Sequence, residues 1–278
     1  MGTALKSLAA RLVALLFALS WGAAFAQERH ALVIGNANYV NAEDLRNPVN
    51  DANDVAARLA QLGYEVYGGG AQINLTRSQM VRAVREFSRS VAQGDTAIVF
   101  YAGHGVQYEG VSYLLPVDDQ DLSYLEDVDL QGFSAEALLD ELGSDVRANT
   151  ILIIDACRDS PLPQRTRTAG GPARGLATIS APAGSYIAYA AAPGQTADDG
   201  TGRNGVFTAA LLAELQDADR RVTDLFNAVR ARVMAQTQGR QTPWSNSSLV
   251  DALYITPPLS GVAGDAIAQV YRSLDDPC

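Results

Sequence analysis

Cysteine and histidine are both scarce in this sequence. Only Cys157 and Cys278 are present, with two histidines in the whole chain. This excludes the multiple-disulfide framework on which small exported domains depend. It also leaves no Cys and His set of the kind that holds structural zinc, so we expect no metal site and no cofactor. A single bridge between Cys157 and Cys278 stays open as an alternative in an oxidising compartment.

Basic residues are also in short supply. The chain has 21 lysines and arginines against 31 aspartates and glutamates, a formal net charge of −10 at pH 7. Binding to nucleic acid requires clustered basic side chains, so we expect no nucleic-acid partner. The acidic excess suits a cationic peptide substrate, although a solvated acidic surface is the simpler explanation.

Long apolar runs are missing except near the N-terminus. Residues 1–26 combine a basic start, an apolar run from Leu12 to Leu19 and the small-x-small sequence Ala24-Phe25-Ala26. The apolar stretch of about 15 residues is shorter than the roughly 20 that cross a bilayer. We therefore expect a secretory signal peptide cleaved before Gln27, a periplasmic or secreted protein, and no membrane partner after cleavage. An uncleaved anchor and a buried helix are the alternatives.

Residues 27–278 are enough for one α/β catalytic domain, with a core expected over residues 29–256 and a tail over residues 257–278. Short apolar runs predict strands near residues 31–35, 64–67, 96–101, 150–155, 185–190 and 252–256. Helical periodicity between them predicts helices near residues 48–62, 77–91, 134–142, 206–215 and 224–235. The alternation predicts a largely parallel sheet with helices on both faces.

Three segments interrupt this alternation. Val106 to Val117 alternates around Glu109-Gly110 and predicts a hairpin. The acidic stretch from Asp118 to Asp129 is typical of a surface loop. Arg158 to Pro182 is rich in Pro, Gly, Thr and Arg without periodicity, which indicates a long mobile loop.

Two expected strand ends carry residues with catalytic chemistry. One strand runs into Ala102-Gly103-His104-Gly105, and the next runs into Asp155-Ala156-Cys157. In a parallel sheet, adjacent strand ends would bring imidazole and thiol into one cleft, where the base can take the thiol proton. A lone Cys is usually an inert core residue, but the coincidence favours Cys157 as nucleophile and His104 as general base. His30, the other histidine, is expected to be a polar surface residue.

Several motifs resemble those of the caspase-like cysteine peptidases. YAGHG at residues 101–105 and DACRD at residues 155–159 are similar to the family's His and Cys motifs, nearer to the metacaspase and bacterial orthocaspase branch of peptidase C14 than to animal caspases. Further similarities are ALVIGNANY at residues 31–39, LRNPVND at residues 45–51 and the stretch over residues 188–207. The resemblance covers about residues 29–256.

The resemblance carries expectations for the fold and the site. It implies a caspase-hemoglobinase-like three-layer sandwich, in which a six-stranded, mostly parallel sheet of order 2-1-3-4-5-6 has helices on both faces. It also implies an oxyanion hole formed by the backbone N–H groups of Gly105 and Cys157, which suits the need for donors aimed at developing negative charge.

The sequence departs from the family at positions that bear on specificity. Asp155 stands where animal caspases carry Gln and Asp159 stands where they carry Gly, so cleavage after aspartate is not carried over. The paired aspartates that bind calcium in many metacaspases have no clear counterpart in Val128 to Ser134, although Asp118 and Asp119 lie nearby. We therefore do not expect activity to require calcium.

Two aspartates predict a substrate pocket for a basic side chain. Asp155 lies two residues before Cys157 and should face the same side of its strand. Asp51 falls in the first turn of a helix, where the helix dipole alone would favour an acid, and the similarity of LRNPVND to the metacaspase pattern places it in the same pocket. We therefore expect an endopeptidase that cleaves peptide or protein substrates after Arg or Lys.

Two alternatives remain open at this point. One is a catalytically silent interaction scaffold with the same fold. The other is a cysteine peptidase of this fold with Asn or Asp specificity. The loop over residues 158–182 contains Arg165, Arg167 and Arg174 and is a candidate for self-cleavage, although a mobile loop without a processing role has the same composition.

Overall fold

The computed structural model describes residues 27–143, 149–157, 179, 181–193, 195, 197, 200–217 and 219–256. The expected signal peptide, the 257–278 tail and nearly all of the 158–182 loop lie outside the described residues. Among the residues that are described, none of the helices combines the length and apolar character needed to cross a membrane.

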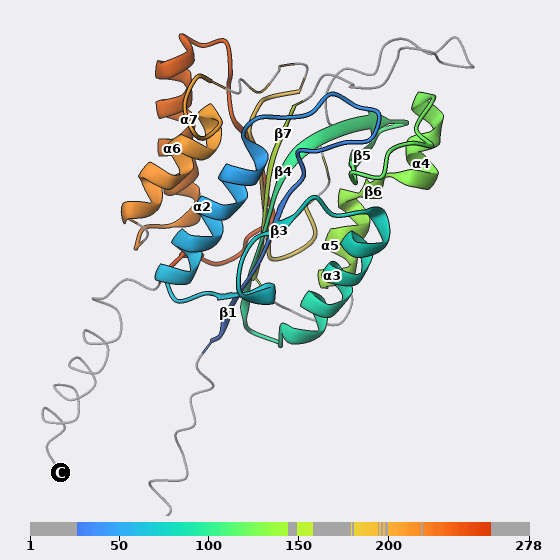
Figure 1. Cartoon of the computed structure of the whole chain (residues 1–278). Helices are drawn as coiled ribbons and strands as arrows, with labels where there is room; N and C mark the ends of the chain where they lie inside the picture. Colours follow the sequence, from blue (N-terminus) through green and yellow to red (C-terminus); the bar gives the residue numbers. More distant parts are fainter. Residues whose placement is uncertain are drawn as a thin grey trace, which may run out of the picture.

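A twisted sheet forms the centre of the molecule, with its main strands in the order β2-β1-β4-β7-β8-β9 (Figure 1). These strands are β1 (Arg29–Gly35), β2 (Glu65–Val66), β4 (Thr96–Tyr108), β7 (Asn149–Cys157), β8 (Ser185–Tyr189) and β9 (Trp244–Ser247). All neighbours are parallel except β9, which runs antiparallel to β8. The expected order 2-1-3-4-5-6 is therefore confirmed.

Three short strands extend this sheet. β3 (Gln72–Ile73) pairs with β1, β5 (Val111–Leu114) forms the predicted hairpin with the end of β4, and β6 (Phe133–Ser134) pairs with β5. Short helical turns occur at η1 (Tyr67–Gly69), η2 (Leu125–Asp127), α4 (Val128–Gln131) and η3 (Leu215–Asp217).

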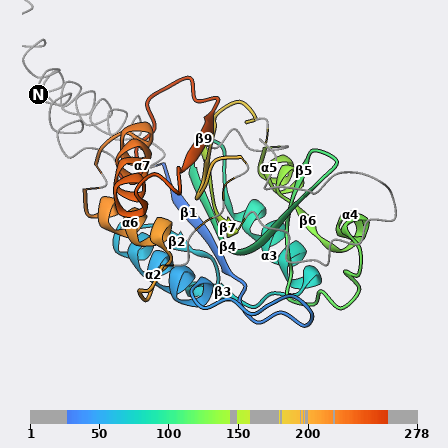
Figure 2. The same ribbon diagram turned by 90° about the horizontal axis from the view of Figure 1, so that it is seen from above.

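Helices cover both faces of the sheet. On one face lie α2 (Pro48–Gln61), α6 (Val206–Glu214) and α7 (Val222–Thr237), and on the other lie α3 (Arg77–Ser90) and α5 (Ala135–Gly143), as the view from above shows (Figure 2). Alternation along β4 divides its side chains between two cores. Phe100 packs with the α2, α6 and α7 side, whereas Val99 and Tyr101 pack with α3 and α5. The three-layer sandwich is confirmed.

The sixth strand was predicted in the wrong place. Residues 252–256 form no strand, and the edge strand is instead β9, whose sequence WSNS has no apolar alternation. Leu253 and Ile255 are nevertheless buried, because this irregular segment packs against the core on the α2 side. The apolar pattern there reflected burial, and burial alone does not specify a strand.

Two polar residues expected at the surface are buried. His30 is only 3% exposed, and its ring nitrogens lie 3.4–3.6 Å from carboxylate oxygens of Glu28, Glu65 and Asp95. Asp119, within the acidic stretch taken for a surface loop, has no exposed surface. Both expectations failed because burial of a polar group requires partners, and most of these partners lie far away in the sequence, Glu65 and Asp95 for His30 and residues 41 and 42 for Asp119.

Candidate active site

The two positions expected to carry the chemistry lie on adjacent strands. The strand was expected to end at Tyr101, but β4 continues through the whole YAGHG motif, because Gly103 and His104 still pair with β7 and the residues after His104 pair with β5. His104 of β4 and Cys157 of β7 are register partners at the last position of the parallel ladder. Neighbouring strands lie about 4.8 Å apart, so the fold brings the two backbones as close as paired strands allow.

The His104 side chain is buried and its ring is held at one nitrogen. Nε2 lies 2.8 Å from the carbonyl oxygen of Glu43, and the ring packs against that of Tyr39 with centroids 4.6 Å apart. A carbonyl oxygen only accepts hydrogen bonds, so Nε2 carries the hydrogen. In the neutral imidazole the lone pair is then on Nδ1, which makes Nδ1 the atom able to take a proton.

Two tyrosines hold the backbone around His104. The Tyr39 hydroxyl accepts a hydrogen bond from the His104 N–H at 2.8 Å, and the Tyr101 hydroxyl lies 2.8 Å from the His104 carbonyl oxygen. Burial raises the pKa of Tyr101 well above its ordinary value, so this hydroxyl stays a neutral donor. A Cβ at Gly103 would lie 2.6 Å from the Tyr101 hydroxyl and 2.7 Å from that of Tyr39. The glycine is therefore required by these hydroxyls, and sequence reasoning missed the role of both tyrosines.

The two expected pocket acids meet at the start of α6. Asp51, in the first turn of α2, is 3% exposed and accepts a hydrogen bond from the Gly205 N–H at 3.1 Å. Asp155, on β7, accepts one from the Thr208 hydroxyl at 2.6 Å. A Cβ at Gly205 would lie 3.4 Å from Asp51 Oδ2 and 3.6 Å from Asp155 Oδ2. Both carboxylates therefore border the same small space.

An arginine of the chain itself lies beside these acids, which sequence reasoning did not anticipate. The Arg203 guanidinium donates to both oxygens of Asp54, from Nε at 2.9 Å and from Nη2 at 3.0 Å. The pKa of Asp54 is lowered mainly by this hydrogen bond. The pKa of Arg203 is raised first by its hydrogen bond to Asp54 and, more weakly, by the charge of Asp51. Arg203 thus lies within the electrostatic field of the pocket acid.

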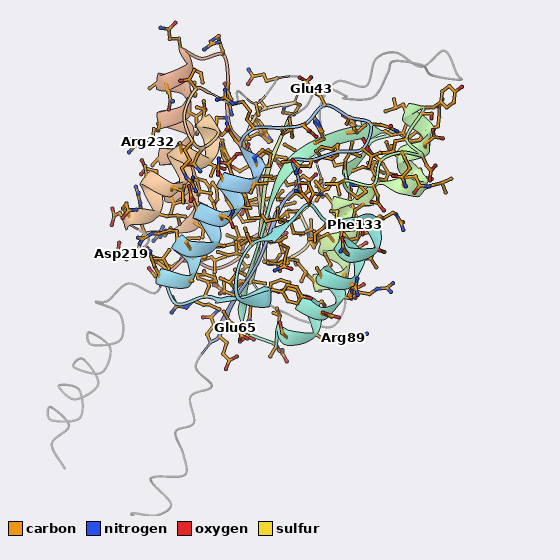
Figure 3. All side chains as sticks on the ribbon, in the orientation of Figure 1. Glu43, Glu65, Arg89, Phe133, Asp219 and Arg232 are labelled. Carbon is orange, nitrogen blue, oxygen red and sulfur yellow. The ribbon has the colours of Figure 1, made fainter. Side chains whose placement is uncertain are left out.

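The remaining candidate groups occupy two separate places. Gly105, expected in the oxyanion hole, follows His104 on β4 and is the register partner of Leu114. Glu28, His30 and Glu65 are the one described group whose potential metal-ligand atoms lie within 4.8 Å of one another. This group lies at the amino ends of the strands, and the labelled Glu43 and Glu65 mark the two opposite ends of the molecule (Figure 3). It is therefore separate from the candidate active site.

Comparison with known proteins relates the chain to caspase-type domains. The sequence is 27% identical over 260 residues to the mucosa-associated lymphoid tissue lymphoma translocation protein 1 homolog of Mus musculus, a match that covers 90% of this chain. It is 27% identical over 247 residues to the Homo sapiens protein, covering 85% of this chain. The chain spans only 29% and 28% of the length of these two relatives.

Solved structures share the fold. Caspase-1 from Spodoptera frugiperda superposes with a TM-score of 0.61 at 17% identity, covering 84% of this chain and 92% of that one. The structure of pro-sf-caspase-1 superposes with a TM-score of 0.60 at the same identity and coverage.

The family model of the peptidase C14 caspase domain matches residues 28–254, which include β1, the YAGHG and DACRD motifs, and both Asp51 and Asp155. The chain therefore belongs to the caspase-domain family of peptidases.

Proposed function

We propose that this chain is a cysteine endopeptidase in which Cys157 is the nucleophile and His104 the general base. The observation that carries the proposal is the register pairing of His104 with Cys157 at the end of two adjacent parallel strands. The Nε2–H tautomer set by the Glu43 carbonyl supports it, because this tautomer has its lone pair on Nδ1, the nitrogen that can then take a proton.

The reaction follows from these groups. His104 Nδ1 takes the thiol proton of Cys157, and the thiolate attacks the carbonyl carbon of the scissile bond. The N–H groups of Gly105 and Cys157 stabilise the resulting oxyanion. The imidazolium returns its proton to the leaving amine as the C–N bond breaks, giving a thioester. Water, deprotonated by the same imidazole, then hydrolyses the thioester and restores the thiol.

The proposed specificity is for Arg or Lys before the cleaved bond. Its support is the convergence of Asp51 and Asp155 on the space beside Gly205, where a cationic side chain would meet two carboxylates. A charge-assisted contact is worth about 1.5 to 3 kcal/mol, or roughly 10- to 150-fold in rate if it forms in the transition state. A substrate with Asp at that position would bring a third negative charge into the space and should be the poorest.

The catalytic assignment is tested by Cys157→Ala and His104→Ala. Each should abolish peptide hydrolysis while leaving circular dichroism and the thermal unfolding midpoint near those of the parent, because the two residues act as one unit. His30→Gln is the matched control, since it removes the other histidine at the opposite end of the sheet. Activity of Cys157→Ala within a few-fold of the parent would show that the nucleophile lies elsewhere.

The specificity is tested with peptides that differ only in Arg, Lys, Asn or Asp before the cleaved bond. Asp51→Asn and Asp155→Asn should each lower kcat/KM on the Arg peptide by about tenfold or more. Thr208→Val is the control, because it removes the hydroxyl bonded to Asp155 and keeps the charge. Faster cleavage after Asn or Asp than after Arg would overturn the proposed specificity.

We also propose that the protein acts outside the cytoplasm and needs no metal. The pattern of residues 1–26 supports export, and N-terminal sequencing of protein from the periplasm should begin at Gln27. Activity should be unchanged by a calcium chelator. A mature protein that starts at Met1 would contradict the proposed export. Loss of activity on chelation that is restored by added calcium would contradict the proposed independence from metal.

A further inference from the structure

Asp119 is a charged residue with no exposed surface in a stretch that is otherwise acidic and largely solvated. Its two carboxylate oxygens accept hydrogen bonds from the backbone N–H groups of Asn41 and Ala42, each at 2.7 Å. Its carbonyl oxygen accepts a third from the Asn41 side-chain amide at 3.1 Å. These are short, charge-assisted contacts to the backbone of a segment about 80 residues away in sequence.

The segment that Asp119 binds is followed by the residue that contacts the candidate base. Glu43, the residue after Ala42, places its carbonyl oxygen 2.8 Å from His104 Nε2. Asn41 and Glu43 are themselves exposed, and Ala42 between them is only partly buried against a neighbouring apolar cluster. Asp119 therefore binds Ala42, the residue directly before Glu43, whose carbonyl sets the tautomer of His104.

Among the described residues, further hydrogen bonds hold the chain on either side of this segment, and one of them joins the Tyr39 N–H to Oδ1 of Asp44, the residue after Glu43, at 2.9 Å. Val40 donates its N–H to the Val117 carbonyl at 3.1 Å, and Leu45 donates its N–H to the Ala37 carbonyl at 2.9 Å. Between them, the backbone N–H groups of Asn41 and Ala42 both donate to the Asp119 carboxylate. An aspartate is suited to this position because both of its oxygens accept, whereas an asparagine presents one acceptor and one donor.

We propose that Asp119 is a positioning residue for the proposed peptidase, holding the loop of residues 41–43 so that the Glu43 carbonyl keeps His104 in the Nε2–H tautomer. This rests on the proposed role of His104 as base. Without the hydrogen bonds from Asn41 and Ala42 to Asp119, the Glu43 carbonyl shifts away from Nε2. The imidazole then also populates the tautomer with its hydrogen on Nδ1. That form cannot accept the thiol proton, so the fraction of competent enzyme falls.

The kinetic test compares Asp119→Asn with Asp118→Asn. Asp118 is the matched control, because its carboxylate also accepts a backbone N–H, that of Arg77 at 2.7 Å, but it has no bond to the 41–43 loop. Asp119→Asn should lower kcat by about tenfold or more with KM changed less than about twofold, and Asp118→Asn should change neither. The acidic limb of the kcat/KM profile should also move to lower pH in Asp119→Asn, since the carbonyl that stabilises the imidazolium is weakened.

A second measurement does not depend on activity. In the Cys157→Ala background, ¹⁵N spectra of the histidine rings contain two residues only, and His104→Ala assigns them. His104 should show a protonated Nε2 and an unprotonated Nδ1 in the parent, and a mixture of tautomers in Asp119→Asn. If Asp119→Asn is too unstable to study, Asn41→Ala, which removes one side-chain contact to Asp119, should give the same changes in smaller measure.

The outcomes separate this inference from the proposed function. An unchanged tautomer and an unchanged kcat in Asp119→Asn would overturn the positioning role. Equal losses in Asp119→Asn and Asp118→Asn, with no change of tautomer, would overturn it as well, because they would indicate a general loss of stability. A tautomer that depends on Asp119 in a protein that cleaves no peptide would uphold the positioning and overturn the peptidase.

Discussion

The histidine of the candidate site is fixed by groups from two parts of the chain, the segment that contains Tyr39 and Glu43 and the strand residue Tyr101. Tyr39 and Tyr101 bind its main chain, and the Glu43 carbonyl binds its ring. Such fixing limits the orientations that the imidazole can adopt, which matters because a base must lie within hydrogen-bond reach of the proton that it takes. The tyrosine hydroxyls should therefore contribute to activity as well as to stability.

Gly103→Ala tests this contribution. The added Cβ would lie within 2.7 Å of both hydroxyl oxygens, closer than such contacts occur, so at least one hydroxyl must move. We expect the free energy of unfolding to fall by about 1 to 3 kcal/mol for the broken buried hydrogen bond, and kcat to fall with it. Urea unfolding and steady-state kinetics measure the two effects.

Gly110→Ala is the control for backbone strain. Gly110 also has a positive φ, of 85°, but a Cβ there meets no atom within 4 Å. Its substitution should cost stability and leave kcat unchanged, because the hairpin turn is remote from the tyrosines. A Gly103→Ala variant with parental kcat would show that the hydroxyls do not orient the base.

Asp54→Asn should turn Arg203 into an internal competitor of the substrate. The substitution weakens the bidentate pair that holds Arg203 on α2, while the charge of Asp51 continues to attract the guanidinium. We expect KM for the Arg peptide to rise with little change in kcat, because a group competing for the pocket must be displaced by substrate. The double variant Asp54→Asn, Arg203→Gln should restore KM. An unchanged KM in the single variant would place Arg203 outside the pocket.

The residues that sequence reasoning identified and missed differ in a physical way. His104, Cys157, Asp51 and Asp155 could be named as candidates because each occupies a fixed offset within a local motif. The burial of Asp119 could not be read locally, since it depends on N–H groups contributed from residues 41 and 42. Buried polar groups that are satisfied across the fold leave no periodic signal in the sequence.

At the scale of elements, β4 is one long strand that pairs with different partners along its length. Its first part, up to His104, lies in the parallel ladder with β1 and β7, and its end pairs antiparallel with β5. The apolar run predicted only the first part, because Gly103 and Gly105 are poor strand formers by propensity. Strong apolar strands such as β1 were predicted well, whereas the polar edge strand β9 was missed because hydrogen bonding to β8, rather than a buried face, makes it a strand.

The segment after β7 gives a prediction at this scale, although most of it lies outside the described residues. We predict that the parent protein cuts itself within residues 158–182, after Arg165, Arg167 or Arg174, because these basic residues in a Pro- and Gly-rich stretch suit the proposed specificity. Intact-mass analysis of the parent and of Cys157→Ala checks this. Equal cutting in both proteins would assign it to another protease.

For the molecule as a whole, the two helical layers give the sheet a protected interior. Separate apolar cores lie on its two faces, and β4 and β7 are central strands with a parallel neighbour on each side. The candidate nucleophile and base therefore lie on β7 and β4, which are buried on both faces. Asp119 and Glu43 lie on loops outside the strands of the sheet. The comparison with caspase structures concerns this central framework, since 17% identity supports the shared fold alone.

The central place of β4 and β7 has a consequence for amide hydrogen exchange. Amides of strands that open only when the whole domain unfolds exchange at the slowest rate, whereas edge strands exchange through local opening. Exchange measured by mass spectrometry should therefore be slowest for residues 97–103 and 150–156 and faster for β2 and β9 at the two edges. Mild denaturant should release the edge strands and the loops that carry Asp119 and Glu43 first, so that peptide hydrolysis is lost before the two strands carrying His104 and Cys157 separate.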